Sequence, residues 1–413
     1  MLVVEYKVKA KSSQYKAIDE AIRTVQFIRN KSIRHWMDAP KEAKINRFTL
    51  NKYSTELRNE FPFVKDLNSM AVQAAAERGW LAISRFYDSV AVASLRASNC
   101  KSKKPGKKGF PRFQKDNRSV EYKTSGWSLH PTKRRITITD KKGISELKLL
   151  GKWDIHEYPV KSIKRVRLVR RADGYYCQFC VDVECVDIQP PTGQEIGLDV
   201  GLESFYNDSN GHQEPNPKFL RKGEVAIKHS QRAIYKKVKG SSGRRKARAK
   251  YSRKHLRVSR QRTEHAKRLA RHVCKSNDLV AYEDLRVANM LKNHCLAKSI
   301  ADASWYQFRQ WIEHFATKFG RLAVAVPPQY TSQECSQCKV IVKKSLSTRT
   351  YICSCGLILQ RDWNAAINIL LKAKSRGGHP QSNAKGVGTS TLLGASLVEQ
   401  VLTMNLESQG FSS

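Results

Sequence analysis

The sequence predicts a multidomain α+β protein, because three regions of different patterning follow one another along its 413 residues. Apolar residues recur at three-to-four spacing over most of the first hundred positions, which indicates helices. Short alternating strands are expected between residues 119 and 186, and strands alternate with helices from about residue 194 onwards. The length exceeds what one ordinary hydrophobic core accommodates, so two or three domains are expected.

The first region is predicted to be helical because its apolar residues return on one helix face. Ala, Ile, Val and Phe recur at this spacing over residues 14–37 and again over residues 68–97. A shorter helix is expected between them, at residues 47–60.

A basic segment follows these helices. Residues 101–118 hold eight basic residues and one acid, and they are rich in Lys, Pro and Gly. A charge run of this kind is usually a solvated loop. Here Phe110 and Phe113 alternate with basic residues, which suits backbone phosphates and stacked bases together. The candidate nucleic-acid contacts of this segment are Lys107, Lys108 and Arg112.

The second region predicts a small β-barrel or sandwich with one basic face. Short strands with basic residues at alternate positions are expected at 133–140, 144–151, 163–171 and 175–184. Cys177 and Cys180 form a C-x2-C pair, which could indicate a metal site. A strand places these two positions on opposite faces, so buried structural cysteines are the favoured interpretation.

The third region begins near Gln194 and is predicted to be an α/β layer with a mixed sheet. A strand and a hairpin are followed by a basic helical stretch, in which residues 218–272 hold 21 Lys+Arg and two acids. A solvated helix face is the plainer interpretation. Such a face usually carries acids that pair with basic residues one helical turn away, and this stretch has almost none. The remaining elements are a strand at 278–285, a helix at 302–319, a strand at 321–327, a cysteine cluster and a closing helix at 363–374.

The charge of the chain indicates a nucleic-acid partner. Its 76 Lys+Arg against 36 Asp+Glu give a formal net charge of +40. This excess excludes acidic solvating proteins, argues against an enzyme of small molecules alone, and requires a polyanion for neutralisation. With 40% hydrophobic residues, disorder throughout the chain is also excluded.

The composition also predicts the compartment. No apolar run approaches the roughly 18 to 20 residues of a membrane span, and Lys7 and Lys9 interrupt the stretch where a signal peptide would be apolar. We therefore expect a protein of the cell interior with no membrane partner. The ten cysteines then argue against a disulfide framework, because the cytosol keeps thiols reduced.

Acids of the third region are candidate ligands for divalent metal ions. Asp199 and Glu283 interrupt or end apolar strands, where burying a carboxylate is costly unless a cation or donor compensates it. A strand end that reaches solvent would explain either acid alone, and Asp284 is an alternative to Glu283. Asp362 directly precedes a predicted helix, where it could equally be an N-cap. If Asp199, Glu283 and Asp362 converge, their oxygens suit one or two Mg²⁺ or Mn²⁺ ions that activate water for phosphodiester hydrolysis.

The cysteine cluster predicts a structural zinc site. Cys335 and Cys338 are separated by two residues, and Cys353 and Cys355 by one. Four thiolates match a closed zinc site in number and reach. The second arm is one residue shorter than usual, so both of its thiolates can bind only if Gly356 opens the turn. With no acid or histidine among the ligands, the zinc is expected to brace a small ribbon and to take no part in hydrolysis.

Several segments, taken in order, resemble the TnpB-type proteins of bacterial transposons, which are compact RNA-guided DNA endonucleases and relatives of type V CRISPR effectors. The resemblance is carried by GLDVGLESF around Asp199, VAYEDLRVANM around Glu283, LAKSIADASWYQFRQWIEHFATKFGR, PPQYTSQECSQC, and CGLILQRDWNAAINI around Asp362. GFPRF at residues 109–113 and the helical N-terminal layout extend it over roughly residues 1–372.

The resemblance implies a RuvC-like nuclease with an RNase H fold, whose catalytic acids match Asp199, Glu283 and Asp362. This resolves both ambiguities in favour of catalysis. Its zinc ribbon matches Cys335, Cys338, Cys353 and Cys355. The implied domains are a β-barrel wedge domain of the oligonucleotide-binding type at 1–9 and 101–190, a helical recognition domain at 10–100, the nuclease at 194–330 and 357–374, the ribbon at 331–356, and a disordered tail at 375–413.

The resemblance also implies a guide RNA, and a target DNA with a short flanking motif that the recognition and wedge parts read. Gln73 and Thr124 lie near such positions, while Arg244, Arg245 and Lys254 of the basic stretch would line the channel for nucleic acid. The expected protein is a magnesium-dependent endonuclease of the bacterial cytoplasm, associated with the nucleoid when bound to DNA.

Two alternatives are weighed against this expectation. Some relatives have lost acids and act as nuclease-silent, RNA-guided DNA-binding regulators, but the three acids are intact here. Gln360 does replace an acid that many members carry two positions before Asp362. The other alternative is a strand-transfer transposase of the same fold, which would join DNA without any dependence on RNA.

Overall fold

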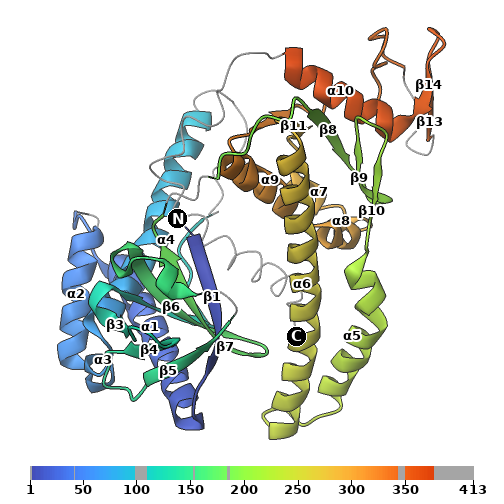
Figure 1. Cartoon of the computed structure of the whole chain (residues 1–413). Coiled ribbons are helices and arrows are strands. Elements are labelled where there is room, and N and C mark those ends of the chain that lie inside the picture. The colour runs from blue at the N-terminus through green and yellow to red at the C-terminus, as the bar shows by residue number, and fades with distance from the viewer. Residues whose placement is uncertain are drawn as a thin grey trace. The chain divides into compact units, whose positions relative to one another are not determined.

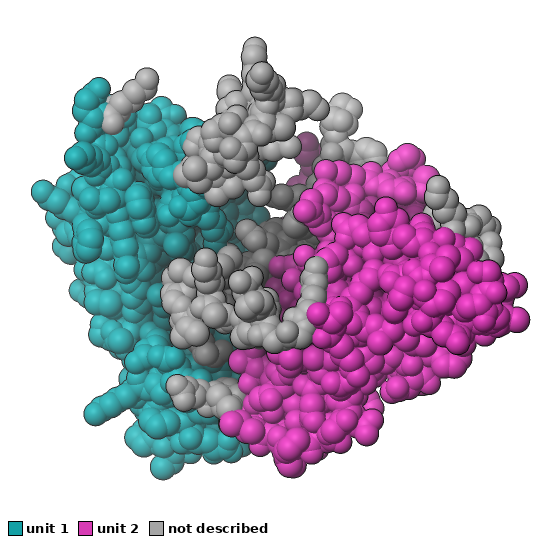
Figure 2. All heavy atoms as spheres, turned by 90° about the horizontal axis from the view of Figure 1, so that it is seen from above, with its two compact units in different colours: residues 1–184 teal, residues 185–413 magenta. Residues whose placement is uncertain are grey.

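The computed structural model of the chain describes residues 2–40, 42–97, 109–151, 154–183, 187–342 and 349–375. The chain forms two compact units, residues 1–184 and residues 185–413 (Figure 2). Lys107, Lys108 and the tail beyond residue 375 lie outside the described residues. Among the helices that the structure describes, none is both long enough and apolar enough to cross a membrane.

The strands of the first unit form one seven-stranded antiparallel sheet. In hydrogen-bonded order they are β2 (Ser119–Lys123), β6 (Ile163–Arg171), β7 (Gly174–Val181), β1 (Leu2–Lys9), β5 (Ser145–Leu150), β4 (Arg135–Ile138) and β3 (Trp127–Leu129), with 3-10 turns at Thr124–Gly126, Ile155–Glu157 and Val160–Ser162. The first strand of the chain thus lies inside the sheet, between β7 and β5. The order ends at β2 and at β3, and closure into a barrel stays a prediction.

The helices of the first unit follow β1 directly. They are α1 (Ser12–Asp38), α2 (Arg47–Glu60), α3 (Pro62–Lys65) and α4 (Ser69–Ala97). Helix α2 begins at Arg47 because the Asn46 side chain accepts hydrogen bonds from the backbone amides of Phe48 and Thr49. The apolar faces of α1 and α4 share one hydrophobic core with the sheet. The three helices expected from apolar spacing are confirmed to within two residues at each end.

The C-x2-C pair of the first unit is structural in its packing. Cys177 and Cys180 lie in β7 with exposures of 0% and 1%, and both are free thiols. Burial raises the pKa of both thiols, so they are held in the uncharged form. The interpretation as buried cysteines is confirmed.

The second unit contains a five-stranded mixed sheet, as expected. Its hydrogen-bonded order is β10 (Gln213–Pro215), β9 (Ser204–Asp208), β8 (Glu195–Val200), β11 (Leu279–Glu283) and β12 (Leu322–Val326). The strands β8, β11 and β12 are parallel, while β9 and β10 run antiparallel to their neighbours. Three parallel strands therefore end at the same edge of the sheet.

Helices cover both faces of this sheet (Figure 1). The basic stretch forms two helices that pack side by side, α5 (Phe219–Tyr235) and α6 (Ser242–Ser276). Helix α6 and helix α9 (Trp305–Phe319) share a core with Leu198 and Tyr282 on one face. Helix α10 (Arg361–Ser375) packs through Ile369 and Ala373 against Ala281 on the other.

The helix expected at 302–319 is two helices with a break. After the short α7 (Val287–Met290), α8 (Ala297–Ala303) ends at Ala303, and α9 starts at Trp305 after the single residue Ser304. Ser304 has a φ of 57°, in the left-handed region, which an α-helix does not continue through. The expected start was therefore wrong, because a serine gives no local signal of this conformation.

Gly197 allows α10 to approach β8 closely. A Cβ at this position would lie 2.2 Å from the backbone oxygen of Ala366 and 2.9 Å from the Cβ of Leu370. Only a residue without a side chain fits between the strand and the helix backbone. This contact sets the position of α10, which carries Asp362 in its first turn.

Gly197→Ala is expected to lower the free energy of unfolding by about 2–3 kcal/mol, because a backbone atom must move to accept the methyl group. Gly223→Ala is the matched control: its added Cβ would be 3.6 Å from Val258, and alanine is the better helix former. Thermal melting of both variants measures the difference. Equal melting temperatures would show that α10 does not press on Gly197.

Candidate metal-binding sites

Strand register places Asp199 and Glu283 side by side. Parallel pairing of β8 with β11 matches Gly197 with Ala281 and Leu198 with Tyr282. The next residues, Asp199 and Glu283, therefore lie at the carboxyl ends of neighbouring strands. Because side chains alternate between faces, both acids share the face of Gly197 and Ala281, which is the face that α10 covers.

Asp362 reaches the same edge from α10. The helix begins at Arg361, so Asp362 is in its first turn and is not the N-cap that the sequence allowed. Its Oδ2 accepts a hydrogen bond from Arg349 Nη1 at 3.2 Å, and Arg349 also contacts Glu203 at 2.6 Å. The Asp362 side chain is 15% exposed. Its negative charge is thus compensated by an arginine at the margin of the site.

The charges of Glu283 and Asp362 act on Asp199. Burial, followed by the charges of Glu283 and Asp362, raises the pKa of Asp199 well above its ordinary value, against the opposing charge of Arg361. Burial also raises the pKa of Glu283, although a hydrogen bond from Thr331 and the charge of Lys372 oppose it. Glu283 and Asp362 thus lie within electrostatic reach of Asp199, and the negative charge gathered there favours a bound cation.

The alternative acid, Asp284, lies outside this group. Its side chain is 59% exposed and forms an ion pair with Arg309. Glu283 is partly buried, and Thr331 Oγ1 donates a hydrogen bond to its Oε1 at 2.6 Å. Geometry thus favours Glu283 over Asp284 as a ligand.

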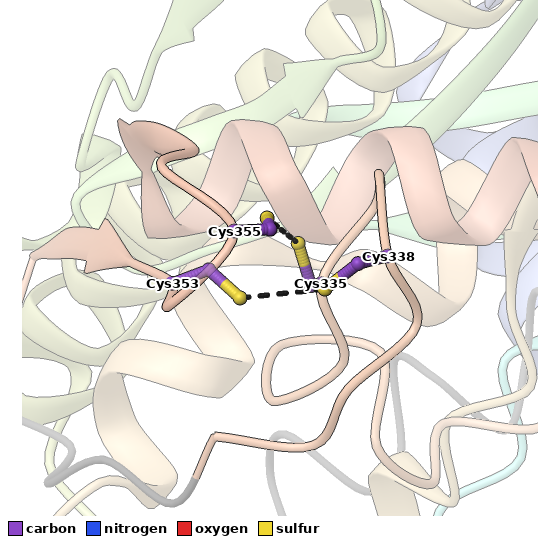
Figure 3. Close-up of side chains that lie close together, drawn as sticks. All are labelled: Cys335, Cys338, Cys353 and Cys355. Carbon is purple, nitrogen blue, oxygen red and sulfur yellow. Dashed lines mark hydrogen bonds between the residues drawn. The ribbon is translucent and has the colours of Figure 1, made fainter.

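The four cysteines form a second candidate site, with the geometry of a zinc centre (Figure 3). All four Sγ atoms lie within 4.8 Å of one another. The Sγ atoms of Cys335 and Cys355 are 3.6 Å apart, and those of Cys338 and Cys353 are 3.5 Å apart. A tetrahedral ion with Zn–S bonds of about 2.3 Å has sulfur atoms about 3.8 Å apart, so the cluster fits zinc closely.

The shortened cysteine arm is accommodated in a tight turn. Cys353 and Cys355 lie between the antiparallel strands β13 (Thr350–Ile352) and β14 (Ile358–Gln360). Gly356 has a φ of 90°, which opens the turn as the sequence required. Hydrogen bonding from the backbone amide of Cys355 lowers the pKa of the Cys353 thiol to about 6, which favours a thiolate there. For Cys338 and Cys355 a backbone amide also lowers the thiol pKa, but desolvation and hydrogen bonds among the thiols outweigh it and raise the pKa.

The two sites differ in how tightly their ligands gather. Among the described residues, the four cysteines are the one group of three or more Cys, His, Asp or Glu side chains close enough to hold a metal ion. The acids are spread more widely. Carboxylates spaced in this way suit a pair of metal ions about 3.5–4 Å apart, with different acids binding each ion.

Sequence reasoning missed the polar contacts behind the acids. Thr331 is 4% exposed, and Asn364 and Asn368 are 0% and 1% exposed. The two asparagines lie four residues apart on α10, and their side-chain amides donate to backbone carbonyls of the segment before Cys335. Buried asparagines at one helix face were the only available signal, and Thr331 gave none.

The expected nucleic-acid contacts fall in several places. Gln73 is partly buried in α4, and Thr124 is exposed in the 3-10 turn that packs on α4. Arg112 is exposed, and its carbonyl oxygen accepts a hydrogen bond from Arg29. Arg244 and Arg245 lie in the first turn of α6, where Arg244 donates to the carbonyl of Lys237. Lys254 donates to the carbonyl of Ala226, so it links α6 to α5.

Comparison with known proteins shows which families the chain resembles. Residues 178–294 match a family model described as "Probable transposase", and residues 305–369 match one described as "Cas12f1-like, TNB domain". A "Putative RNA-guided DNA endonuclease" of Streptomyces pristinaespiralis is 26% identical over 402 residues, covering 94% of each chain. A "TnpB-like protein" of Acanthamoeba polyphaga mimivirus is 38% identical over 87 residues, which are 21% of this chain and 16% of that protein.

A solved structure shares the fold. The Cas12f1 protein in its complex with sgRNA and target DNA superposes with a TM-score of 0.51 at 13% sequence identity, covering 87% of this chain and 83% of that one. The chain thus has the mixed α/β architecture of the Cas12 effectors.

Proposed function

Because the chain is a TnpB-type protein, we propose that it is an RNA-guided DNA endonuclease whose catalytic acids are Asp199, Glu283 and Asp362. The observation that carries the proposal is the placement of Asp199 and Glu283 on one sheet face, at the edge where the parallel strands end, with the charge of Asp362 acting on Asp199 from α10. A buried carboxylate such as Asp199 destabilises a protein unless a cation or a hydrogen-bond donor compensates it.

The donor set fits magnesium or manganese ions. Carboxylate oxygens are the ligands these ions prefer, and burial together with the charges of Glu283 and Asp362 raises the pKa of Asp199, which a cation would counteract. When bound, such ions supply an activated water and stabilise the leaving oxygen of a phosphodiester. Asp199 and Glu283 would hold them from the strand ends and Asp362 from α10.

The proposed nucleic-acid path follows the basic surfaces. The helices α5 and α6 contain most of the 21 Lys+Arg of residues 218–272, and Arg245 is exposed at the start of α6. We assign the sheet of the first unit to the oligonucleotide-binding wedge (1–9 and 101–190) and its helices to the recognition domain (10–100). Phosphate contacts would position a guide–target duplex, and base pairing with the guide RNA would supply sequence choice.

The four-cysteine site is proposed to hold zinc as a structural ion at residues 331–356, beside the nuclease parts 194–330 and 357–374. All four of its ligands are thiolates, so no position is left open for a water or a substrate.

RNA that co-purifies with the protein is expected to direct cleavage of a plasmid library carrying a matching target and randomised flanks. Sequencing the bound RNA defines the guide, and sequencing depleted plasmids defines the flanking motif. A library with a scrambled target is the control. Cleavage that persists without RNA, or joined DNA products, would instead support the strand-transfer alternative. Binding without cleavage in Mg²⁺ would support a regulator.

A further inference from the structure

Thr331 makes a short contact with one of the proposed catalytic acids. Its hydroxyl oxygen is 2.6 Å from Glu283 Oε1 and 3.2 Å from the carbonyl oxygen of Pro328. A hydroxyl has one proton, and the shorter contact to a charged acceptor is the stronger bond. The residue is 4% exposed, so water competes little for this proton.

The backbone of Thr331 is itself anchored to α10. Asn368 Nδ2 donates to the carbonyl of Thr331 at 3.0 Å and to that of Glu334 at 2.6 Å. Asn364 Nδ2 donates to the same Glu334 carbonyl at 2.8 Å, and its Oδ1 accepts from the amide of Ser336 at 3.0 Å. Asn364 and Asn368 are four residues apart and so lie on one face of α10, and that face is hydrogen-bonded to residues 331–336.

The anchored segment joins the two candidate metal sites. Thr331 contacts Glu283, and Glu334 directly precedes the zinc ligand Cys335. Asp362, the third acid, precedes the two asparagines on the same helix. One hydrogen-bonded unit thus connects the cysteine cluster, α10 and Glu283.

We propose that Thr331 is a positioning residue that orients the Glu283 carboxylate for divalent-metal binding, and that the ribbon and α10 hold Thr331 in place. A carboxylate fixed through one oxygen presents the other in a constant direction, and this lowers the entropic cost of binding an ion. The inference rests on the proposed function, because it requires Glu283 to be a ligand. It also gives the ribbon an indirect influence on the acids, beyond bracing.

Thr331→Val keeps the shape of the side chain and removes the hydroxyl, whereas Thr331→Ser keeps the hydroxyl. Mn²⁺ titration of the full-length protein, followed by electron paramagnetic resonance, measures the metal directly. We expect Thr331→Val to raise the Kd of the Asp199-dependent Mn²⁺ site at least about tenfold, and Thr331→Ser to stay within about threefold of wild type. The Mg²⁺ concentration for half-maximal cleavage should shift in parallel, with the rate recovering at high Mg²⁺.

Asp199→Ala defines the background of this titration, and zinc content measures folding of the ribbon. If Thr331→Val loses zinc, Asn368→Ala supplies the test, because it keeps the Thr331 hydroxyl but releases the Thr331 backbone. The Kd for Mn²⁺ should then rise more than about fivefold. Wild-type affinity in every variant that retains zinc would overturn the inference while leaving the nuclease intact. A wild-type protein with neither an Asp199-dependent Mn²⁺ site nor cleavage would overturn the proposed function as well.

Discussion

Alanine at Asp199, Glu283 or Asp362 is expected to slow cleavage of an RNA-matched target at least about a thousandfold, which corresponds to about 4 kcal/mol of transition-state stabilisation. Each substitution removes one of three carboxylates that share the α10 side of the sheet edge. Guide and target binding should stay within about threefold of wild type, because phosphate contacts depend on basic side chains. Single-turnover cleavage and filter binding measure both quantities on one preparation.

Asp284→Ala is the matched control for Glu283→Ala. It removes the neighbouring carboxylate, which is exposed and paired with Arg309, and cleavage should remain within about threefold of wild type. Loss of activity in Asp284→Ala with retention in Glu283→Ala would reverse the assignment of the second acid. Retained cleavage in any of the three main variants would remove that residue from the catalytic set.

The sequence pointed to Asp199 and to Glu283 or Asp284 because strand ends carry their own signal, and the family resemblance chose Glu283. An acid within or after an apolar run such as residues 196–200 or 279–283 marks the edge of a buried sheet. Neighbouring parallel strands have their carboxyl ends at the same edge of the sheet. If β8 and β11 are adjacent, their terminal carboxylates therefore lie close together. Adjacency itself is a tertiary property, and only the structure supplied it.

Other features had no local signal. The helix predicted to start after Asp362 begins at Arg361, because a helix start depends on backbone contacts as well as on the capping residue. Thr331 stands in a loop whose pattern predicts neither strand nor helix, and its partner Glu283 is 48 residues away. The break at Ser304 and the contact at Gly197 likewise depend on packing partners distant in the chain.

Loss of the zinc site is expected to have the second large effect. Cys335→Ser or Cys353→Ser should leave well below one zinc ion per chain and lower the yield of folded protein, because structural zinc contributes folding free energy directly. The core of the ribbon consists of Cys335, Cys353 and Tyr351, with Val342 and Leu357 packed around them, which is too little apolar surface to fold without a metal. Zinc content by mass spectrometry and thermal melting measure the two effects.

Cys295→Ser is the control, since Cys295 is an exposed free thiol outside the cluster and should keep full zinc and yield. Unchanged zinc content in Cys335→Ser would contradict the four-thiolate site. The sites should then respond asymmetrically: Asp199→Ala stops cleavage and keeps zinc, whereas Cys335→Ser loses zinc and also weakens cleavage. The second half of this asymmetry follows from the hydrogen bonds of Asn364 and Asn368, through which a disordered ribbon would release Thr331 and hence Glu283.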